Sequence, residues 1–382
     1  MHACGIICEY NPFHNGHLFQ IDMAKQKFGL PVVCVMSGDF VQRGEYALYD
    51  KGIRANWAIK AGANLVLELP FPYSSMTAEI FARSGVALLE QSGLCDRILF
   101  GSESDDLDML TTIAKADDNA DVKTRVVEIQ KSNRSYGFAK ARQKALEEFL
   151  EEKDFKGIQT PNDILGIEYI KAIHRSKSNL KPFCIKREGA SHHSGESGGN
   201  IASATHIRSL LRSNSLQEIK NYVPEWVYED MQSTPYRELS DNLAILCALM
   251  LLSPAELKEY AEIGGGLEFK ISKAAKESDT LSELYEKIKN KSLTDAKVRR
   301  AVLFAFLKVE KETMKQMPLY TNILAFDETG RELLKQAKDK SSIILASRIA
   351  DIKKNEKAFS QFQLAERAKN VFEKLQLNQL NH

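Results

Sequence analysis

The fold is decided by the stretch Ala3-Cys4-Gly5-Ile6-Ile7-Cys8-Glu9-Tyr10-Asn11-Pro12-Phe13-His14-Asn15-Gly16-His17. Its first six residues are apolar or small and predict a buried strand. After a short polar loop, residues 18–28 place their apolar side chains at helical spacing. In an open parallel sheet, ligands bind at the carboxyl ends of strands, where the next helix presents N–H groups and a positive dipole to phosphate. The stretch therefore predicts a phosphate-binding strand, loop and helix.

Short apolar runs alternate with longer amphipathic segments through the first half of the chain, as in βαβ units that form a parallel sheet. The expected strands are residues 3–8, 32–36, 65–67, 97–100 and 182–187. The expected helices are residues 18–28, 52–61, 77–91, 107–116, 123–131 and 139–151, followed by helices that begin at Pro161 and after Ser203. The fold class is therefore α/β, with a Rossmann-like parallel sheet.

The second part of the chain is expected to be mostly helical, because Lys and Glu are frequent from about residue 242 to the end. Before it, residues 189–199 are rich in Ser, Gly and His and predict a mobile loop. We expect two domains, at residues 1–220 and 221–382.

Composition places the chain among folded proteins of the cytoplasm. Of 382 residues, 43% are hydrophobic and 27% are charged, which is enough to bury a sizeable core. A formal charge of +1 excludes a globally basic nucleic-acid binder but permits a local basic face. The six cysteines form no CxxC pair and indicate reduced thiols. No apolar run approaches the ~18 residues of a membrane span. The oligomeric state stays open.

A fixed metal site in the protein is not expected, although two cysteines and two histidines share the first stretch. Cys4 and Cys8 are four residues apart, which on a strand separates them by about 13 Å, too far for one tetrahedral ion.

Two motifs carry a resemblance to known enzymes. His14-Asn15-Gly16-His17 resembles the HxGH signature of the adenylyltransferase superfamily, and Ile201-Ala202-Ser203-Ala204-Thr205-His206-Ile207-Arg208 resembles its second motif, ISSTxIR. The alternative is that both are ordinary helix caps.

Further blocks extend this resemblance over nearly the whole chain. They are Gly5 to His17, Met36-Ser37-Gly38-Asp39-Phe40-Val41-Gln42-Arg43-Gly44, Leu67-Glu68-Leu69-Pro70, Phe100-Gly101-Ser102-Glu103, Pro161-Asn162-Asp163-Ile164-Leu165-Gly166 and Lys186-Arg187. Together they resemble the bacterial tRNA(Met) cytidine acetate ligase family. The resemblance implies a nucleotidyltransferase-like catalytic domain and a tRNA-docking domain. It also implies that acetate is activated with ATP as acetyl-adenylate, and that the acetyl group passes to the wobble cytidine of elongator tRNA(Met), giving N4-acetylcytidine. Mg²⁺ is expected with ATP.

The same resemblance assigns site residues. His14, His17 and Arg208 are expected to be catalytic, by stabilising the pentavalent α-phosphate and holding the departing phosphates. Contacts to ATP are expected from Ile7, Cys8, Glu9, Tyr10, Asn11, Pro12, Phe13, His14, Asn15, Gly16, His17, Leu18, Gly101, Asn162, Arg187, Ser203 and Thr205. By local sequence alone, Gly101 is equally a turn, Asn162 a helix N-cap and Arg187 a solvated strand end.

Two further groups are expected to touch the other substrates. Ser37, Asp39 and Arg43 follow the second expected strand and are assigned to positioning acetate or nucleotide, unless the loop is held by its own hydrogen bonds. Lys297, Arg299 and Arg300 are assigned to tRNA phosphates, unless they form an ordinary solvated helix face.

Two other functions fit parts of the pattern. One is an adenylyltransferase for a small cofactor precursor, for which the helical second half would be superfluous. The other is a non-catalytic RNA-binding protein, which would not need His14, His17 and Arg208.

Overall fold

The computed structural model describes residues 2–133, 136–150, 160–187, 200–238, 243–290 and 293–380. The loop expected at residues 189–199 lies outside the described residues.

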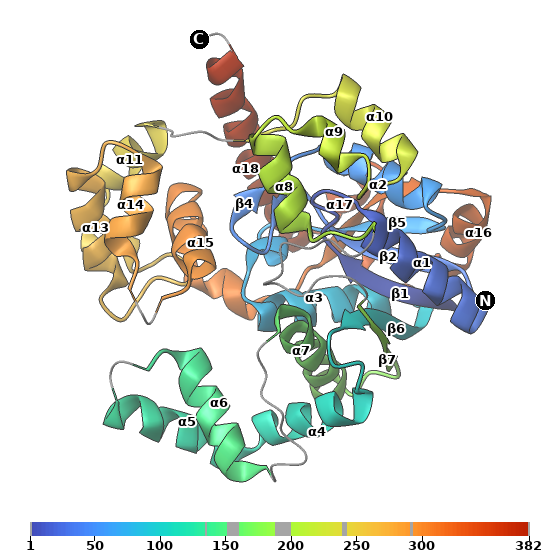
Figure 1. Ribbon diagram of the computed structural model, residues 1–382, viewed down its shortest axis with the longest axis horizontal. Helices are drawn as coiled ribbons and strands as arrows, with labels where there is room; N and C mark the ends of the chain where they lie inside the picture. The colour runs from blue at the N-terminus through green and yellow to red at the C-terminus, as the bar shows by residue number, and fades with distance from the viewer. Residues whose placement is uncertain are drawn as a thin grey trace.

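A seven-stranded sheet forms the centre of the molecule, in the order β7-β6-β1-β2-β5-β8-β9 (Figure 1). Its strands are β1 (Ala3–Cys8), β2 (Val32–Ser37), β5 (Leu65–Leu69), β6 (Cys95–Ser102), β7 (Lys181–Lys186), β8 (Tyr320–Phe326) and β9 (Ile344–Ala346). Strands β7, β6, β1, β2 and β5 are mutually parallel, which confirms the expected Rossmann-like sheet. Strand β8 pairs antiparallel with β5, and β9 pairs parallel with β8. A separate two-stranded ribbon consists of β3 (Phe40–Val41) and β4 (Glu45–Tyr46).

The expected helices of the first half are confirmed, with ends shifted by a few residues. They are α1 (Asn15–Phe28), α2 (Lys51–Lys60), α3 (Ala78–Gln91), α4 (Leu107–Asp118), α5 (Ala120–Ser132), α6 (Phe138–Phe149), α7 (Pro161–Ser176) and α8 (Ala204–Arg212). The later helices are α9 (Leu216–Ile219), α10 (Glu225–Ser233), α11 (Leu243–Met250), α12 (Pro254–Leu257), α13 (Leu267–Glu277), α14 (Leu281–Ile288), α15 (Asp295–Phe306), α16 (Glu328–Ala337), α17 (Ile349–Ile352) and α18 (Glu356–Leu380). None of the helices in the described ranges is long and apolar enough to cross a membrane.

Helices cover both faces of the sheet, and its central strands β1 and β2 are buried throughout and almost entirely apolar. Along β2, Val33 and Val35 belong to a core shared with α3 and α7, whereas Cys34 and Met36 belong to a core shared with α1, α2 and α8. Successive side chains of a strand point to opposite faces, so a strand buried on both sides needs apolar residues at every position.

The C-terminal part of the chain is divided between the sheet and a separate helical lobe. Helices α11 to α15 enclose a core of their own and lie on the opposite side of the molecule from the N-terminus (Figure 1). Strands β8 and β9 extend the sheet, and α16 and α18 contribute Leu333, Ala337, Ala368 and Phe372 to the core beside α3. The two-domain division at residue 220 remains a prediction, and the region after it is not helical throughout.

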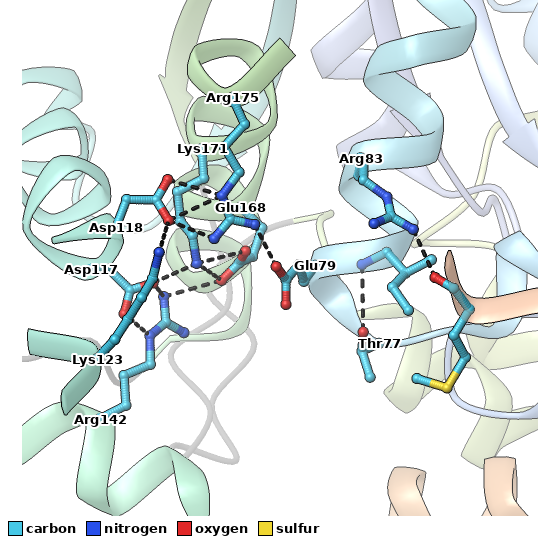
Figure 2. Close-up of polar contacts among 12 residues, drawn as sticks. Thr77, Glu79, Arg83, Asp117, Asp118, Lys123, Arg142, Glu168, Lys171 and Arg175 are labelled. Carbon is cyan, nitrogen blue, oxygen red and sulfur yellow. Dashed lines mark hydrogen bonds and ion pairs between the residues drawn. The ribbon is translucent and has the colours of Figure 1, made fainter. Parts of the chain in front are cut away.

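A buried ion cluster fixes the hairpin of α5 and α6, which projects from the lower edge in Figure 1. Arg142 of α6 donates to both carboxylate oxygens of Asp117 in α4, at 2.7 and 2.8 Å. Lys171 of α7 pairs with the same carboxylate and with Glu168, as Figure 2 shows. Burial raises the pKa of Asp117, but Arg142 and Lys171 outweigh it and hold that pKa below its usual range. The cluster therefore ties three helices together by charge.

Candidate functional site

Two stacked histidines form the start of α1 at the carboxyl end of β1. His14 is the N-cap residue: its Nδ1 accepts from the Gly16 N–H at 3.1 Å, and its own N–H donates to Nδ1 of His17 at 3.2 Å. The ring centroids are 3.6 Å apart. At Gly16, an added Cβ would lie 3.0 Å from Cε1 of His14, so a side chain there would press on the imidazole. The motif thus fixes both rings in one orientation.

Both imidazoles are neutral and carry their proton on Nε2. Because each Nδ1 accepts a backbone hydrogen bond, the ring proton must lie on the other nitrogen. Burial, reinforced by Arg187 and Arg208, lowers the pKa of His14 to about 3. Burial, with the neighbouring His14 and Arg187, lowers the pKa of His17 well below its usual value. Each histidine therefore offers one fixed N–H donor without carrying a charge.

The backbone N–H groups at the start of α1 are largely occupied, which corrects the expectation that they are free for phosphate. The Asn15 N–H donates to the Tyr222 carbonyl at 2.9 Å, and the Gly16 N–H is held by His14. The Asn15 side chain also donates to the carbonyls of Asn200 and Asn221. The donors left at this end of the helix are the imidazole Nε2–H groups.

Arg187 lies beside the histidines, directly after β7. It acts on the pKa of both His14 and His17, and its backbone N–H donates to the Ser102 carbonyl at 2.9 Å. Gly101 in β6 makes room for it, since an added Cβ would lie 3.0 Å from Cγ of Arg187. The structure thus brings together two residues that are 86 positions apart.

Arg208 approaches the histidines from α8. Its guanidinium donates to the Asn11 carbonyl at 2.9 Å and to the Thr205 hydroxyl at 3.0 Å. Burial, followed by repulsion from Arg43, lowers its pKa to about 10, so the side chain remains cationic at neutral pH. Ser203 caps α8 by accepting from the His206 N–H at 3.2 Å. The motif that ends at Arg208 therefore places a guanidinium cation against the loop that precedes His14.

The remaining residues of the first motif support this arrangement from β1 and the loop after it. Glu9 accepts from the Gln42 N–H at 2.7 Å, and burial raises the pKa of its carboxyl. Asn11 accepts from the Leu48 N–H at 2.8 Å, and Tyr10 packs against His17 with centroids 4.8 Å apart. The other residues expected near ATP are placed as follows: Ile7 and Cys8 are buried in β1, Pro12 and Phe13 are buried in the loop, and Leu18 is half-buried in α1.

Asn162 lies at the start of α7 against the loop that follows β6. Its side chain donates to Glu103, and the neighbouring Asp163 accepts from Ser102 and from the Glu103 N–H. The N-cap of this helix is Thr160, so the alternative assignment of Asn162 as a cap is wrong. These hydrogen bonds hold the carboxyl end of β6 against the start of α7.

Arg54 was missed by the sequence analysis, although its whole side chain is buried beneath the site. It donates to the carbonyls of Glu9, Ser37, Gly38 and Tyr49, at 2.7, 3.0 and 2.9 Å for Glu9, Ser37 and Tyr49. It shares the apolar face of α2 with Trp57 and Ala58, three and four residues later. An arginine on the buried face of a helix is the signal that could have revealed it.

Ser37 and Asp39 are buried beneath the loop after β2. Lys51 bridges Asp39 and Glu68, at 2.9 Å to each. The other Asp39 oxygen and the Ser37 hydroxyl have no hydrogen-bond partner within the described part of the chain. Arg43, in contrast, is exposed at the turn between β3 and β4.

The three residues assigned to tRNA differ in their environments on α15. Lys297 is exposed, and Arg299 is part-exposed and paired with Glu45. Arg300 is buried and forms a two-pronged pair with Glu262, at 2.7 and 2.9 Å. Its role is to fix α15, which removes it from the candidates for RNA contact. Within the described residues, no group of three or more His, Cys, Asp or Glu side chains is arranged to hold a metal ion.

The low pKa values of the histidines give a direct prediction for the free protein. We expect ¹⁵N NMR of the imidazoles to show His14 and His17 as neutral Nε2–H tautomers from pH 8 to pH 5. Since their folded pKa values lie below the unfolded value of ~6.5, stability falls as the pH drops below ~6.5, where only the unfolded chain takes up these protons. His14→Asn should reduce this pH dependence of the urea midpoint. Titration of either ring near pH 6.5 would contradict the assignment.

Comparison with known proteins gives concordant matches over the whole chain. The family model described as HIGH Nucleotidyl Transferase matches residues 1–382. A tRNA(Met) cytidine acetate ligase of Caldanaerobacter subterraneus subsp. tengcongensis is 39% identical over 369 residues, covering 92% of this chain and 90% of the relative. A relative of the same name from Thermoanaerobacter sp. is 36% identical, with coverages of 92% and 90%. The crystal structure of Thermotoga maritima TmcAL bound with alpha-thio ATP is 30% identical, with a TM-score of 0.90, and the match covers 98% of this chain and 95% of that one.

Proposed function

The chain belongs to the tRNA(Met) cytidine acetate ligase family of HIGH nucleotidyl transferases, and from this we propose that it activates acetate with ATP and acetylates the wobble cytidine of elongator tRNA(Met). The product would be N4-acetylcytidine. The single observation that carries the proposal is the stacked pair His14 and His17, with two neutral Nε2–H donors next to Arg187 and Arg208.

The chemistry requires activation because the oxygen of free acetate cannot leave as an oxide. In the first step, an acetate oxygen attacks the α-phosphorus of ATP, the bond to the bridging oxygen breaks, and pyrophosphate departs. In the second step, the exocyclic amine of cytidine attacks the acetyl carbon of acetyl-adenylate. The bond between the acetyl carbon and the phosphate oxygen of AMP breaks, and the amine loses a proton. AMP is the second product.

The histidines suit the first step because negative charge builds on the α-phosphate oxygens as the fifth bond forms. A fixed neutral donor needs no reorganisation at that moment and repels no nearby arginine. We assign the Nε2–H groups of His14 and His17 to those oxygens. Arg208, with Ser203 and Thr205 at the start of α8, would hold the departing β- and γ-phosphates.

The nucleotide would lie toward the β6 and β7 side of the histidines. Gly101 and Arg187 meet at this edge, and Asn162 is tied to the same loop through Glu103. Mg²⁺ enters as part of the substrate, bound to the phosphates of ATP, and offsets their charge. We keep Ser37 as a residue that positions acetate, since its buried hydroxyl has no partner among the described residues and can donate to a carboxylate. Asp39, itself a carboxylate, would contribute only by holding Lys51.

The proposal is tested by incubating the protein with ATP, Mg²⁺, labelled acetate and bacterial tRNA that lacks the modification, without coenzyme A. We expect label in N4-acetylcytidine after nuclease digestion, in amounts that depend on ATP. A control with acetyl-coenzyme A in place of ATP and acetate should give no label. Acetate-dependent exchange of pyrophosphate into ATP without any labelled nucleoside would refute the tRNA step alone. If neither labelled nucleoside nor acetate-dependent exchange is found, the proposal fails and a small-molecule adenylyltransferase is favoured.

A further inference from the structure

The turn between β3 and β4 is held rigidly between the catalytic cluster and the helical lobe. On one side, the Gln42 N–H donates to Glu9 at 2.7 Å. On the other, Arg300 of α15 donates to the Gln42 carbonyl at 3.3 Å. Gly44 adopts a φ of 75° and packs so closely that an added Cβ would lie 2.7 Å from the backbone nitrogen of Arg300. The turn therefore has a fixed position between β1 and α15.

Arg43 is the exposed cation at the centre of this turn. No ion pair links it to a carboxylate in the described part of the chain. Burial lowers the pKa of Arg208, and repulsion from Arg43 is the next cause. The same two causes, in the same order, lower the pKa of Arg299 on α15. Arg43 thus lies between two other guanidinium groups, one in the catalytic cluster and one in the lobe.

The guanidinium groups of Arg208, Arg43 and Arg299, which we call the arginine row, repel one another. A bound anion would offset this repulsion. Glu9 interacts with both Arg208 and Arg43, and Glu45 pairs with Arg299, so two carboxylates face three guanidinium groups. Arg43 is exposed and has no ion pair in the described residues, which leaves its guanidinium accessible to a ligand. Guanidinium groups bind phosphate through parallel charge-assisted hydrogen bonds, which makes a phosphate the matching anion.

The position of the row in the sheet separates it from the nucleotide side. The sheet order places β6 and β7 on one side of β1 and β2 on the other. Gly101, Arg187 and Asn162 belong to the β6 and β7 side, whereas Arg43 follows β2 and Arg299 belongs to the lobe. The row therefore leads away from Gly101, Arg187 and Asn162, where we place the adenosine, and leaves room for a second substrate on the other side.

From this arrangement we propose that Arg43 and Arg299 form a binding site for a backbone phosphate of the RNA substrate, next to the nucleotide that is modified. This inference rests on the proposed function, because it takes tRNA as the second substrate. It replaces the expectation that Arg43 positions acetate or nucleotide. Glu45 competes with the RNA phosphate for Arg299, since the carboxylate and the phosphate would use the same guanidinium.

The test measures binding of fluorescently labelled tRNA at several salt concentrations, in the absence of ATP and acetate. Arg43→Gln and Arg299→Gln should each weaken binding about tenfold and reduce the slope of log affinity against log salt by about 0.7–0.9. Arg43→Lys, which retains the charge, should keep the slope. Glu45→Gln should strengthen binding, a gain that loss of a purely structural contact would not produce.

Arg331→Gln is the matched control. Arg331 is exposed and paired with a single glutamate, Glu328, at 3.3 Å, as Arg299 is paired with Glu45, but it lies on α16 at the far end of the molecule (Figure 1). Its substitution should leave tRNA binding unchanged.

Several outcomes would overturn the phosphate site. The first is an unchanged salt slope in both Arg43→Gln and Arg299→Gln. The second is no binding of tRNA by the wild-type protein. The third is a raised KM for ATP with normal tRNA binding in these two variants, which would assign the cations to the triphosphate. A wild-type protein that binds tRNA but transfers no acetate would defeat the proposed function alone, because the binding measurement does not depend on turnover.

Discussion

His17→Ala lowers acetate-dependent exchange of pyrophosphate into ATP by about 10²–10³-fold, the usual cost of removing one donor that acts on developing charge. His17 also accepts the His14 N–H, so the substitution additionally removes a helix cap worth about 1 kcal/mol. The measurement is the exchange rate at saturating ATP and acetate, compared with the urea midpoint of the same variant.

Two substitutions separate the donor from the cap. In His17→Asn the side-chain oxygen takes the place of Nδ1 and can accept the His14 N–H, but the Nε2–H is lost. In His17→Gln the amide nitrogen takes the place of Nε2, while the cap is lost. If the donor matters for catalysis, Gln should retain more exchange activity than Asn, although Asn should be the more stable. An exchange rate in His17→Asn equal to that of the wild type would eliminate the assigned role.

Arg54→Met is expected to give the largest loss of stability, at least about 3 kcal/mol. The substitution leaves up to four carbonyls without their donor in a fully buried position, and each unsatisfied buried group costs about 1–3 kcal/mol. Because two of these carbonyls follow β1 and β2 directly, the exchange activity should fall as well. Urea unfolding and the exchange assay measure the two effects.

Arg54→Lys should lie between the wild type and Arg54→Met, since an ammonium group has three donors and can satisfy only part of the set. Lys60→Met is the control on the same helix: it removes a positive charge at an exposed position and should change stability by no more than about 0.5 kcal/mol. An Arg54→Met variant as stable as this control would show that the carbonyls find other donors.

The parallel part of the fold could be predicted because β1, β2 and β5 are buried along their whole length and largely apolar, and because β6 and β7 each contain a shorter apolar run. Strand β8 could not be recognised in this way. Its residues Tyr320–Phe326 are buried only at the start, and its partner β5 lies about 250 residues earlier in the chain. The hydrophobic pattern of a segment can show that one of its faces is apolar. It does not show with which strand, far away in the sequence, the segment will pair.

The candidate site was predictable where the chemistry is local and not where it depends on tertiary contacts. The spacing of His14 and His17 on one turn of helix predicted that they act together. The occupation of the Asn15 N–H by Tyr222 was not predictable, because that carbonyl arrives from the loop before α10. The burial of Arg54 and Arg300 was hidden for a similar reason: their partners come from loops and carboxylates far away in sequence.

The late return of β8 to the sheet has a consequence for synthesis of the chain on the ribosome. The five parallel strands are complete at residue 186, but the strand that covers β5 emerges more than a hundred residues later. At about 5–20 residues per second, the delay is on the order of ten seconds. During that time the apolar strand Leu65–Leu69 presents an unpaired edge, the kind of surface on which nascent chains aggregate. The nascent enzyme is therefore prone to aggregation until β8 is synthesised and pairs with β5.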